Sequence, residues 1–174
     1  MSEKPKCIII TGRPGSGKST LSKELAKLLN TPVISRDEIK EGYVNTFGIC
    51  HDELPPDSNR IVTGTFFDTV EFLLASKVSL IAEAAFQHSV WQSKMDALTS
   101  AAKVCIVICS VESETAAHRY LQRGLNDPNR EFYHGDAPMT GYDPPAFELP
   151  TIEVSTLDGY SPTLDSVRDF IAAS

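Results

Sequence analysis

The chain has 174 residues, of which 41% are hydrophobic and 22% charged, and this composition is typical of one soluble globular domain. The formal net charge of −7 argues against nucleic acid as a partner, because nucleic-acid binders usually present a basic face. The sequence contains no apolar stretch long enough to span a bilayer and no signal-peptide pattern, so we expect a cytoplasmic location without membrane contact.

The first expected element is a buried strand over residues 6–11, an apolar run rich in isoleucine. A glycine-rich loop follows, and then a helix whose leucines recur at helical spacing until Asn30 and Pro32 stop it. The loop, residues 12–19, reads Gly-Arg-Pro-Gly-Ser-Gly-Lys-Ser and is a complete G-x-x-x-x-G-K-[ST] motif. Strand, loop and helix therefore occur in the order that the motif requires.

This loop predicts a phosphate-binding cradle. Gly12, Gly15 and Gly17 allow positive φ, so that successive N–H groups point into one concavity that holds the β-phosphate of a nucleotide. Lys18 is expected to reach the β- and γ-phosphates, and the Ser19 hydroxyl is expected to reach Mg²⁺. The expected nucleotide contacts here are Gly12, Arg13, Pro14, Gly15, Ser16, Gly17, Lys18, Ser19 and Thr20.

The second expected strand, residues 33–35, leads directly into the acids Asp37 and Glu38. A carboxylate at the carboxyl end of a parallel strand faces the ligand crevice, so Asp37 could accept the proton of an acceptor hydroxyl during phosphoryl transfer. The alternative is helix capping, with Ser35 as N-cap and Glu38 at the third helical position. Capping accounts for Glu38 better than for Asp37, and we take Asp37 as the candidate general base.

A helix from about residue 57 to residue 75 precedes the third expected strand, residues 78–83. This strand ends in Glu83, an isolated acid in apolar surroundings. In nucleotide-hydrolysing folds such an acid supports Mg²⁺ and its waters, and the cost of burying an unpaired carboxylate favours a site role. The alternative is a structural partner for a buried lysine or a backbone amide.

The next helix is expected to open with a capping box over residues 89–92. It leads to a strand over residues 103–109 that is apolar on both faces and is therefore expected inside the sheet. The helix after it is predicted over residues 113–122, with Gly124 just past its end.

The fifth expected strand covers residues 151–155, and the last helix is expected to use Ser161 as N-cap with Pro162 at its first position. Five apolar strands thus alternate with helices along the chain. This alternation predicts an α/β fold in which a parallel sheet carries helices on both faces.

Three arginines lie in or just before the segment of residues 125–150, which is rich in proline. A stretch of this length without regular structure is usually functional, so we expect a substrate lid. Arg119 and Arg123 share one helix face, and Arg130 lies within the segment. Arginines that enter a closing lid can neutralise charge on the transferring phosphoryl group. A solvated basic face paired with nearby glutamates is the alternative.

The histidines and cysteines of the chain give only weak evidence for metal or redox chemistry. The histidines, His51, His88, His118 and His134, show no metal-ligand spacing, although His134 lies in the predicted lid. The cysteines, Cys7, Cys50, Cys105 and Cys109, form no C-x-x-C pattern and are expected to be reduced. The Asn-Lys-x-Asp sequence that reads guanine in GTPases is absent, which favours ATP as the nucleotide.

The segments Ile-Thr-Gly-Arg-Pro-Gly-Ser-Gly-Lys-Ser-Thr and Ser-Arg-Asp-Glu-Ile-Lys resemble those of small P-loop kinases, in particular bacterial kinases akin to the polynucleotide 5′-kinase domain and chloramphenicol phosphotransferase. The similarity extends over nearly the whole chain. It implies a three-layer αβα sandwich whose five-stranded parallel sheet has the order 2-3-1-4-5. It also implies one P-loop kinase domain over residues 1–174, with the lid at about 125–150.

In the family that this chain resembles, the residue matching Asp37 is the general base. The position of Lys40 is basic there and contacts the acceptor. The third strand of the family ends in an acid, as it does at Glu83 in this chain.

We therefore expect an ATP- and Mg²⁺-dependent phosphotransferase that moves the γ-phosphate to a hydroxyl of a small molecule. The expected catalytic residues are Lys18, Asp37 and Arg123, the expected Mg²⁺ ligands are Ser19 and Glu83, and Arg119 and Arg130 are expected to contact the nucleotide. One alternative is a 5′-hydroxyl polynucleotide kinase, which would need a basic groove. Another is a regulatory module that binds or hydrolyses nucleotide without an acceptor. The acceptor and the oligomeric state stay open at this point.

Overall fold

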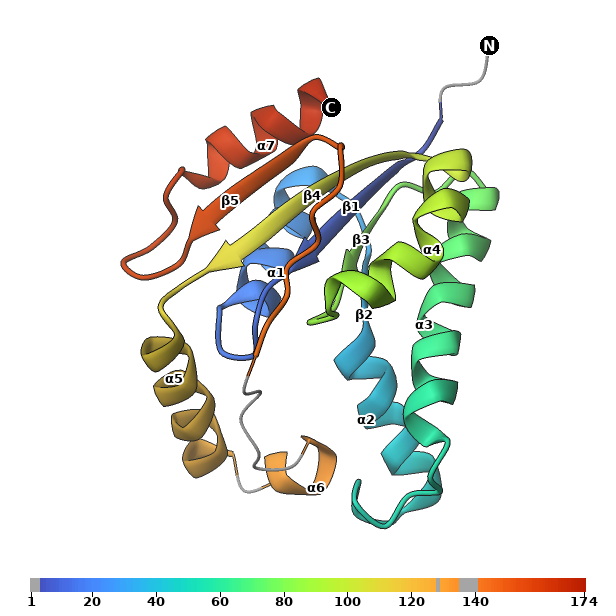
Figure 1. The fold of residues 1–174 in the computed structure, drawn as a ribbon, viewed down its shortest axis with the longest axis vertical. Helices are drawn as coiled ribbons and strands as arrows, with labels where there is room; N and C mark the ends of the chain where they lie inside the picture. The colour runs from blue at the N-terminus through green and yellow to red at the C-terminus, as the bar shows by residue number, and fades with distance from the viewer. Residues whose placement is uncertain (1–3, 128, 135–140) are drawn as a thin grey trace.

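Apolar, β-branched segments form a five-stranded sheet at the centre of the computed structural model, which describes residues 4–127, 129–134 and 141–174 (Figure 1). Every strand pairs in parallel with its neighbours, in the order β2-β3-β1-β4-β5. The strands are β1 (Lys6–Thr11), β2 (Val33–Ser35), β3 (Leu80–Glu83), β4 (Lys103–Ser110) and β5 (Thr151–Ser155). The predicted fold class and strand order are confirmed.

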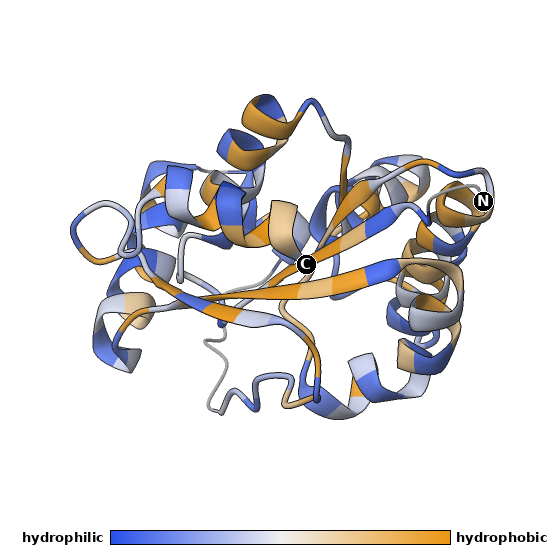
Figure 2. Ribbon diagram, turned by 90° about the horizontal axis from the view of Figure 1, so that it is seen from above, coloured by the Kyte–Doolittle hydropathy of each residue, from blue (hydrophilic) through white to orange (hydrophobic). Residues whose placement is uncertain are grey.

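Helices cover both faces of the sheet, which is why β1 and β4 are apolar on both sides. The helices are α1 (Lys18–Leu29), α2 (Arg36–Phe47), α3 (Ser58–Ala75), α4 (His88–Ala101), α5 (Ser113–Asn126), α6 (Arg130–His134) and α7 (Leu164–Ala173). Cys7 and Ile9 of β1 pack with α3 and α4, whereas Ile8 and Ile10 pack with α1 and α7. Figure 2 shows hydrophobic residues running along the central strands.

An aromatic cluster fills the layer between the sheet and the helices α3 and α4. Phe66 and Phe67 of α3 contact the ring of Trp91 edge-on, with ring centroids 6.2 and 5.7 Å apart. Phe86, which follows β3, packs against the same three rings. Each such side chain contributes about 1.5–3 kcal/mol by burial, so this cluster fixes α3 and α4 on the sheet.

Two predicted helix ends are wrong because tertiary contacts outweigh local signals. Helix α4 begins at His88 rather than after Ser89, and the first turn is satisfied from outside, since the His88 N–H donates to the Asp143 carbonyl at 2.8 Å. Helix α5 continues through Gly124 to Asn126. A glycine inside a helix costs only about 1 kcal/mol relative to alanine, so Gly124 is tolerated there and does not end the helix.

The predicted start of the last helix is also wrong. Ser161 exchanges two backbone hydrogen bonds with Ser155, at 2.8 and 3.0 Å, so its backbone extends the sheet edge instead of capping a helix. The N-cap of α7 is Thr163, whose hydroxyl accepts from the Ser166 N–H at 3.3 Å. Strand β3 starts at Leu80, two residues later than predicted, because the Val78 N–H bonds back to α3.

The four cysteines are free, as the sequence predicted. Burial raises the pKa of Cys7 and of Cys109 to about 12 and that of Cys105 to about 11, so these three thiols stay protonated and inert.

Among the described residues, no helix has both the length and the apolar character that crossing a bilayer requires.

The segment predicted as a lid, residues 125–150, is described except for residues 128 and 135–140. Part of it forms helix α6, which contradicts the expectation of a segment without regular structure. Its last residues pack back on the fold. Phe147 and Leu149 join the hydrophobic cluster below α3 and α4, and the Tyr142 hydroxyl bonds to that of Thr11 at 2.9 Å. A lid function for this segment stays a prediction.

The N-cap of α7 gives a direct test of these boundaries. Thr163→Ala removes the capping hydroxyl and is expected to lower the free energy of unfolding by about 1 kcal/mol. Ser161→Ala is the matched control, because the Ser161 hydroxyl caps no helix and its backbone bonds persist, and it should change stability by less than about 0.5 kcal/mol. Urea unfolding of both variants measures the difference. A larger loss for Ser161→Ala would contradict the assigned cap.

Candidate functional site

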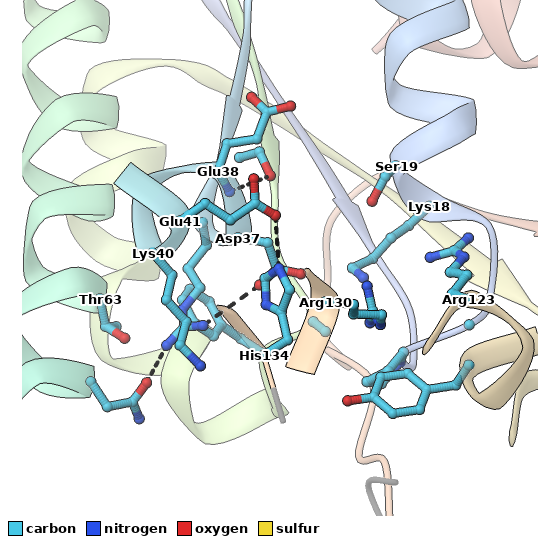
Figure 3. A pocket seen from close by; sticks show the side chains of 18 of the residues that line it. Lys18, Ser19, Asp37, Glu38, Lys40, Glu41, Thr63, Arg123, Arg130 and His134 are labelled. Atoms are coloured by element: carbon cyan, nitrogen blue, oxygen red, sulfur yellow. Dashed lines mark hydrogen bonds and ion pairs between the residues drawn. The ribbon is translucent and has the colours of Figure 1, made fainter. Parts of the chain in front are cut away.

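A cavity of about 520 Å³ lies at the carboxyl edge of the sheet, where α2, α5 and α6 extend beyond the strands (Figures 1 and 3). Figure 3 shows Lys18, Ser19 and Arg123 on one side and Asp37, Glu38 and Lys40 on the other. The full lining is Pro14, Gly15, Lys18, Ser19, Lys23, Ser35, Arg36, Asp37, Glu38, Lys40, Glu41, Asn59, Thr63, Ala85, Phe86, Val90, Tyr120, Arg123, Arg130 and His134. The fold therefore brings half of the predicted site residues to one cavity, among them Lys18, Asp37 and Arg123, whereas Glu83 and Arg119 are not part of its lining.

The glycine-rich loop between β1 and α1 forms the floor of this region, and its glycines adopt the expected positive φ, between 85° and 152°. A Cβ on Gly15 would lie 2.1 Å from the Ala116 carbonyl oxygen, so only glycine fits there. The Ser16 N–H donates to the Arg13 carbonyl at 3.0 Å, and the buried Ser16 hydroxyl has no hydrogen-bond partner in the described part of the chain. The loop thus has the curved backbone that cradles a phosphate.

The last residues of the motif meet the acid at the end of β3. Lys18 and Glu83 are 5% and 2% exposed, and the Lys18 Nζ lies 3.6 Å from the Glu83 Oε1. The Ser19 hydroxyl donates to the same oxygen at 3.3 Å, and the Ser35 hydroxyl donates to Oε2 at 2.8 Å. Both interpretations of Glu83 are therefore met by one geometry: it is the partner of a buried lysine, and it stands beside the hydroxyl expected at Mg²⁺.

Asp37 lies in the first turn of α2 with its side chain 44% exposed, and Arg36 Nη1 lies 3.5 Å from its Oδ1. Partial burial raises the pKa of Asp37, but Lys18, His134 and Arg36 together outweigh burial and hold the pKa below its ordinary value. The helix cap comes from Ser35, whose hydroxyl accepts from the Glu38 N–H at 3.5 Å. Asp37 is therefore ionised at neutral pH, and capping does not require it.

Arg123 and Arg130 both line the cavity, and their contact with a phosphoryl group stays a prediction. The Arg130 guanidinium stacks on Tyr120, 4.8 Å from the ring centroid. Burial, followed by the nearby charges of Arg130 and Arg119, lowers the pKa of Arg123. Cations held this close repel one another, so the cluster favours a bound anion.

The charge of the cavity contrasts with that of the whole chain. Six of the 16 lysine and arginine residues line it: Lys18, Lys23, Arg36, Lys40, Arg123 and Arg130. The acids in the lining are Asp37, Glu38 and Glu41. A protein of net charge −7 thus concentrates positive charge at this cavity, as a site for phosphates needs.

Arg119 is oriented differently from the other two arginines and is absent from the cavity lining. Its Nη2 donates to the carbonyls of Thr156 and Leu157 at 2.9 and 3.1 Å, and its Nη1 donates to the Thr156 hydroxyl at 3.2 Å. Arg13, also expected at the nucleotide, bonds to the Ser113 hydroxyl. Contact of either arginine with nucleotide stays a prediction.

Thr156 is a site residue that the sequence reasoning missed. Its hydroxyl donates to the Ser16 carbonyl at 2.6 Å and accepts from Arg119, so Arg119, Thr156 and Ser16 form a chain of hydrogen bonds that holds the glycine-rich loop. Thr156 directly follows β5, and the position at the carboxyl end of a parallel strand was the available signal.

A second contact that the sequence did not reveal joins α6 to α2. The His134 Nε2 lies 2.7 Å from the Glu41 Oε1, and the Tyr133 hydroxyl donates to Asn45 at 2.8 Å. The His51 N–H also donates to the Phe132 carbonyl at 2.9 Å, so α6 contacts the loop after α2. Such pairs between distant segments leave no local pattern in a sequence.

Comparison with protein families gives a match over residues 7–138 to the AAA_33 model, described as an AAA domain. Two curated proteins match short segments. Adenylate kinase isoenzyme 6 homolog of Plasmodium falciparum is 44% identical over 57 residues, and tRNA dimethylallyltransferase 9 of Arabidopsis thaliana is 54% identical over 39 residues. These segments cover 30% and 22% of this chain, and only 30% and 8% of the two relatives.

Solved structures match over more of the chain. A candidate kinase from Chloroflexus aurantiacus superposes with a TM-score of 0.84 at 22% identity, over 98% of each chain. APS kinase CysC of Mycobacterium tuberculosis, solved with AMPPNP and APS, gives 0.65 at 20% identity, over 98% of this chain and 99% of that one. A chain of the Pnkp1/Rnl/Hen1 RNA repair complex gives 0.62 at 20% identity, over 78% and 44%. These similarities show that the fold is that of P-loop kinases.

The hydrogen-bond chain through Thr156 can be tested with one near-isosteric change. Thr156→Val leaves the Ser16 carbonyl unpaired, and we expect a loss of about 1–3 kcal/mol in the free energy of unfolding and about tenfold weaker ATP binding. Thr65→Val is the control, since the exposed Thr65 hydroxyl bonds only within α3. Chemical unfolding and calorimetric ATP titration measure the two effects. ATP affinity equal to that of the wild type would contradict the proposed support of the loop.

Proposed function

The chain belongs to the AAA_33 family of AAA domains, and we propose that it is an ATP- and Mg²⁺-dependent phosphotransferase that acts on a hydroxyl of a small molecule. One observation carries the proposal: a single cavity is lined by part of the phosphate-binding loop, including Lys18 and Ser19, by the cluster of cations and by the ionised Asp37. A nucleotide-binding module without an acceptor needs the first two features but not the third. We take residues 1–174 as one kinase domain.

The residues present fit an ATP phosphate chain. The loop offers backbone N–H groups, α1 points its N-terminus at the same place, and Lys18 lies at the start of that helix. Ser19 and Glu83 offer the hydroxyl and carboxylate oxygens that Mg²⁺ prefers, 3.3 Å from each other. Mg²⁺ held there would neutralise charge on the β- and γ-phosphates.

In the proposed reaction Asp37 accepts the proton of the acceptor hydroxyl as that oxygen attacks the γ-phosphorus. The new oxygen–phosphorus bond forms while the bond from the γ-phosphorus to the bridging oxygen breaks, and its electron pair stays on ADP. Arg123 and Arg130 lie where they can stabilise the charge on the transferring group. The lowered pKa of Asp37 keeps it ionised, so that it can orient the acceptor hydroxyl by accepting its hydrogen bond. It also makes Asp37 a weak base, so the proton would move to it only as the new oxygen–phosphorus bond forms.

A small acceptor is supported by the negative charge of the chain and by the confined volume of the cavity, about 520 Å³. APS kinase, which shares the fold, was solved with a small-molecule ligand besides a nucleotide analogue. The RNA repair complex shares the fold as well. A polynucleotide acceptor would need a basic surface beyond the cavity, and its use would appear as activity on 5′-hydroxyl oligonucleotides.

Asp37→Asn tests the role of the candidate base. The amide preserves the shape of the side chain but cannot accept the proton, so kcat should fall about 10²–10⁴-fold while ATP affinity stays nearly unchanged. Asp68→Asn is the matched control, because it is the same change at an exposed aspartate of α3 that lies outside the cavity lining. Steady-state rates of ADP formation with an acceptor give kcat. Wild-type kcat in Asp37→Asn would reduce Asp37 to a structural residue.

Glu83→Gln tests the metal assignment. The amide oxygen can still accept from the Ser35 hydroxyl, but the negative charge beside Ser19 is lost. We expect Mg²⁺ to tighten ATP binding in the wild type and to have little effect in the variant, as measured by calorimetric titration with and without EDTA. Because Lys18 loses its buried partner, unfolding free energy should also fall by about 3 kcal/mol. Glu114→Gln, on the surface of α5, is the control. An unchanged Mg²⁺ effect in Glu83→Gln would exclude Glu83 from the metal site.

A further inference from the structure

A second cavity, of about 270 Å³, adjoins the first on the side of α2 and α3. Arg36, Lys40 and Asn59 line both, so the second cavity continues the first beside Asp37. Its full lining is Arg36, Lys40, His51, Leu54, Pro55, Pro56, Ser58, Asn59 and Val62. Neither the phosphate-binding loop nor the arginines of α5 and α6 reach it, so the proposed transfer of phosphate leaves it unexplained.

The charges that line this second cavity are positive. Arg36 and Lys40 stand four residues apart on α2 and therefore on one face of the helix. Burial and the charge of Arg36 lower the pKa of Lys40, and Asp37 only partly opposes them. Arg36 is held by Asp37 and by the Asn59 side chain. None of the described lining residues is acidic. The two like charges are thus held close together at a cavity wall, an arrangement that a bound anion would stabilise.

Two buried polar atoms at the same place have no hydrogen-bond partner among the described residues. Ser58, at the start of α3, is 5% exposed and its hydroxyl is unpaired. The Nε of Arg36 is also buried and unpaired. Buried polar atoms without a partner destabilise a fold, so each such atom requires an explanation. Both atoms are donors, and both belong to residues that line the second cavity, although the atoms themselves lie just behind its surface.

We propose that the second cavity is the acceptor subsite for a negatively charged oxygen group, a carboxylate or a phosphate, so that the acceptor is an anionic alcohol. The anion lies between Arg36 and Lys40, and the buried Ser58 hydroxyl turns towards the cavity to donate a hydrogen bond to it. Leu54, Pro55 and Val62 offer an apolar wall to the carbon skeleton, and the reacting hydroxyl extends towards Asp37. This inference rests on the proposed phosphotransferase function and adds the class of acceptor to it.

Matched sets of acceptors test the inference through ADP formation. Each set has a neutral alcohol, a carboxylate and a phosphate on the same skeleton: glycerol, glycerate and glycerol 3-phosphate, or glucose, gluconate and glucose 6-phosphate. We expect KM for an anionic member to be at least about tenfold lower than for its neutral counterpart, as a charge-assisted hydrogen bond provides. Comparison of the carboxylate with the phosphate identifies which group the subsite takes.

Variants of the cavity wall separate binding from structure. Ser58→Ala removes an unpaired hydroxyl, so the melting temperature should stay the same or rise, while KM for the anionic acceptor increases about tenfold. Lys40→Gln should raise that KM about 10- to 100-fold with a smaller change in kcat, and Lys40→Arg should restore most of the loss. Lys27→Gln, on the exposed surface of α1, is the control and should change neither constant.

A binding experiment tests the inference without relying on turnover. With AMP-PNP and Mg²⁺ filling the phosphate-binding loop, acetate and methylphosphonate are titrated and followed by amide NMR shifts at Ser58 and Lys40. The subsite is supported if Lys40→Gln abolishes binding of the anion and Lys27→Gln retains it. If such binding is seen but no acceptor is phosphorylated, the phosphotransferase proposal alone fails. Equal binding in the two variants, or neutral acceptors used as well as anionic ones, overturns the inference and leaves the phosphotransferase proposal standing.

Discussion

The buried ion pair between Lys18 and Glu83 is the contact on which the geometry of the site depends. It connects the end of the phosphate-binding loop to the end of β3, and the Ser35 hydroxyl bonds to the same carboxylate from β2. Three consecutive strands of the sheet are thereby held in one register at the edge where the cavity opens. Because both charges are almost fully buried, loss of either partner would leave the other without compensation, which is strongly destabilising.

The distribution of charge follows from that constraint. Glu83 neutralises Lys18 while no phosphate is near, but Arg123, Arg130 and Lys40 form no ion pair with a carboxylate of the described residues. The repulsion among them favours binding of anions on both sides of Asp37. On this account one set of cations receives the ATP phosphates and a second set receives the acceptor. Asp37 lies between the two sets, where the hydroxyl and the γ-phosphate would meet.

Sequence patterns predicted the strands and the phosphate-binding loop because these features depend on local spacing and on burial of whole segments. The order of the strands came from the resemblance to small P-loop kinases. Asp37, which lines the cavity, and Glu83, which contacts the lining residues Lys18 and Ser19, were also predictable, since one follows a strand and the other ends one. Two predictions from local signals were wrong. Ser161 pairs with the backbone of Ser155 instead of capping a helix, and Gly124 lies inside α5 instead of ending it. Thr156 was missed although it directly follows a strand, because its partner Ser16 is distant in the sequence. Ser58 could not be assigned from the sequence, because its lack of a partner among the described residues is defined only by the packed structure.

The central claim is that the chain transfers the γ-phosphate of ATP to a hydroxyl, and ³¹P NMR of a reaction mixture tests it most directly. The protein is incubated with ATP, Mg²⁺ and a mixture of hydroxylated acids, sugars and sugar phosphates. The account predicts a new phosphate monoester resonance that grows in step with ADP and is absent when Asp37→Asn replaces the wild type. Inorganic phosphate as the sole new product, formed at a rate that does not depend on the added alcohols, would contradict it.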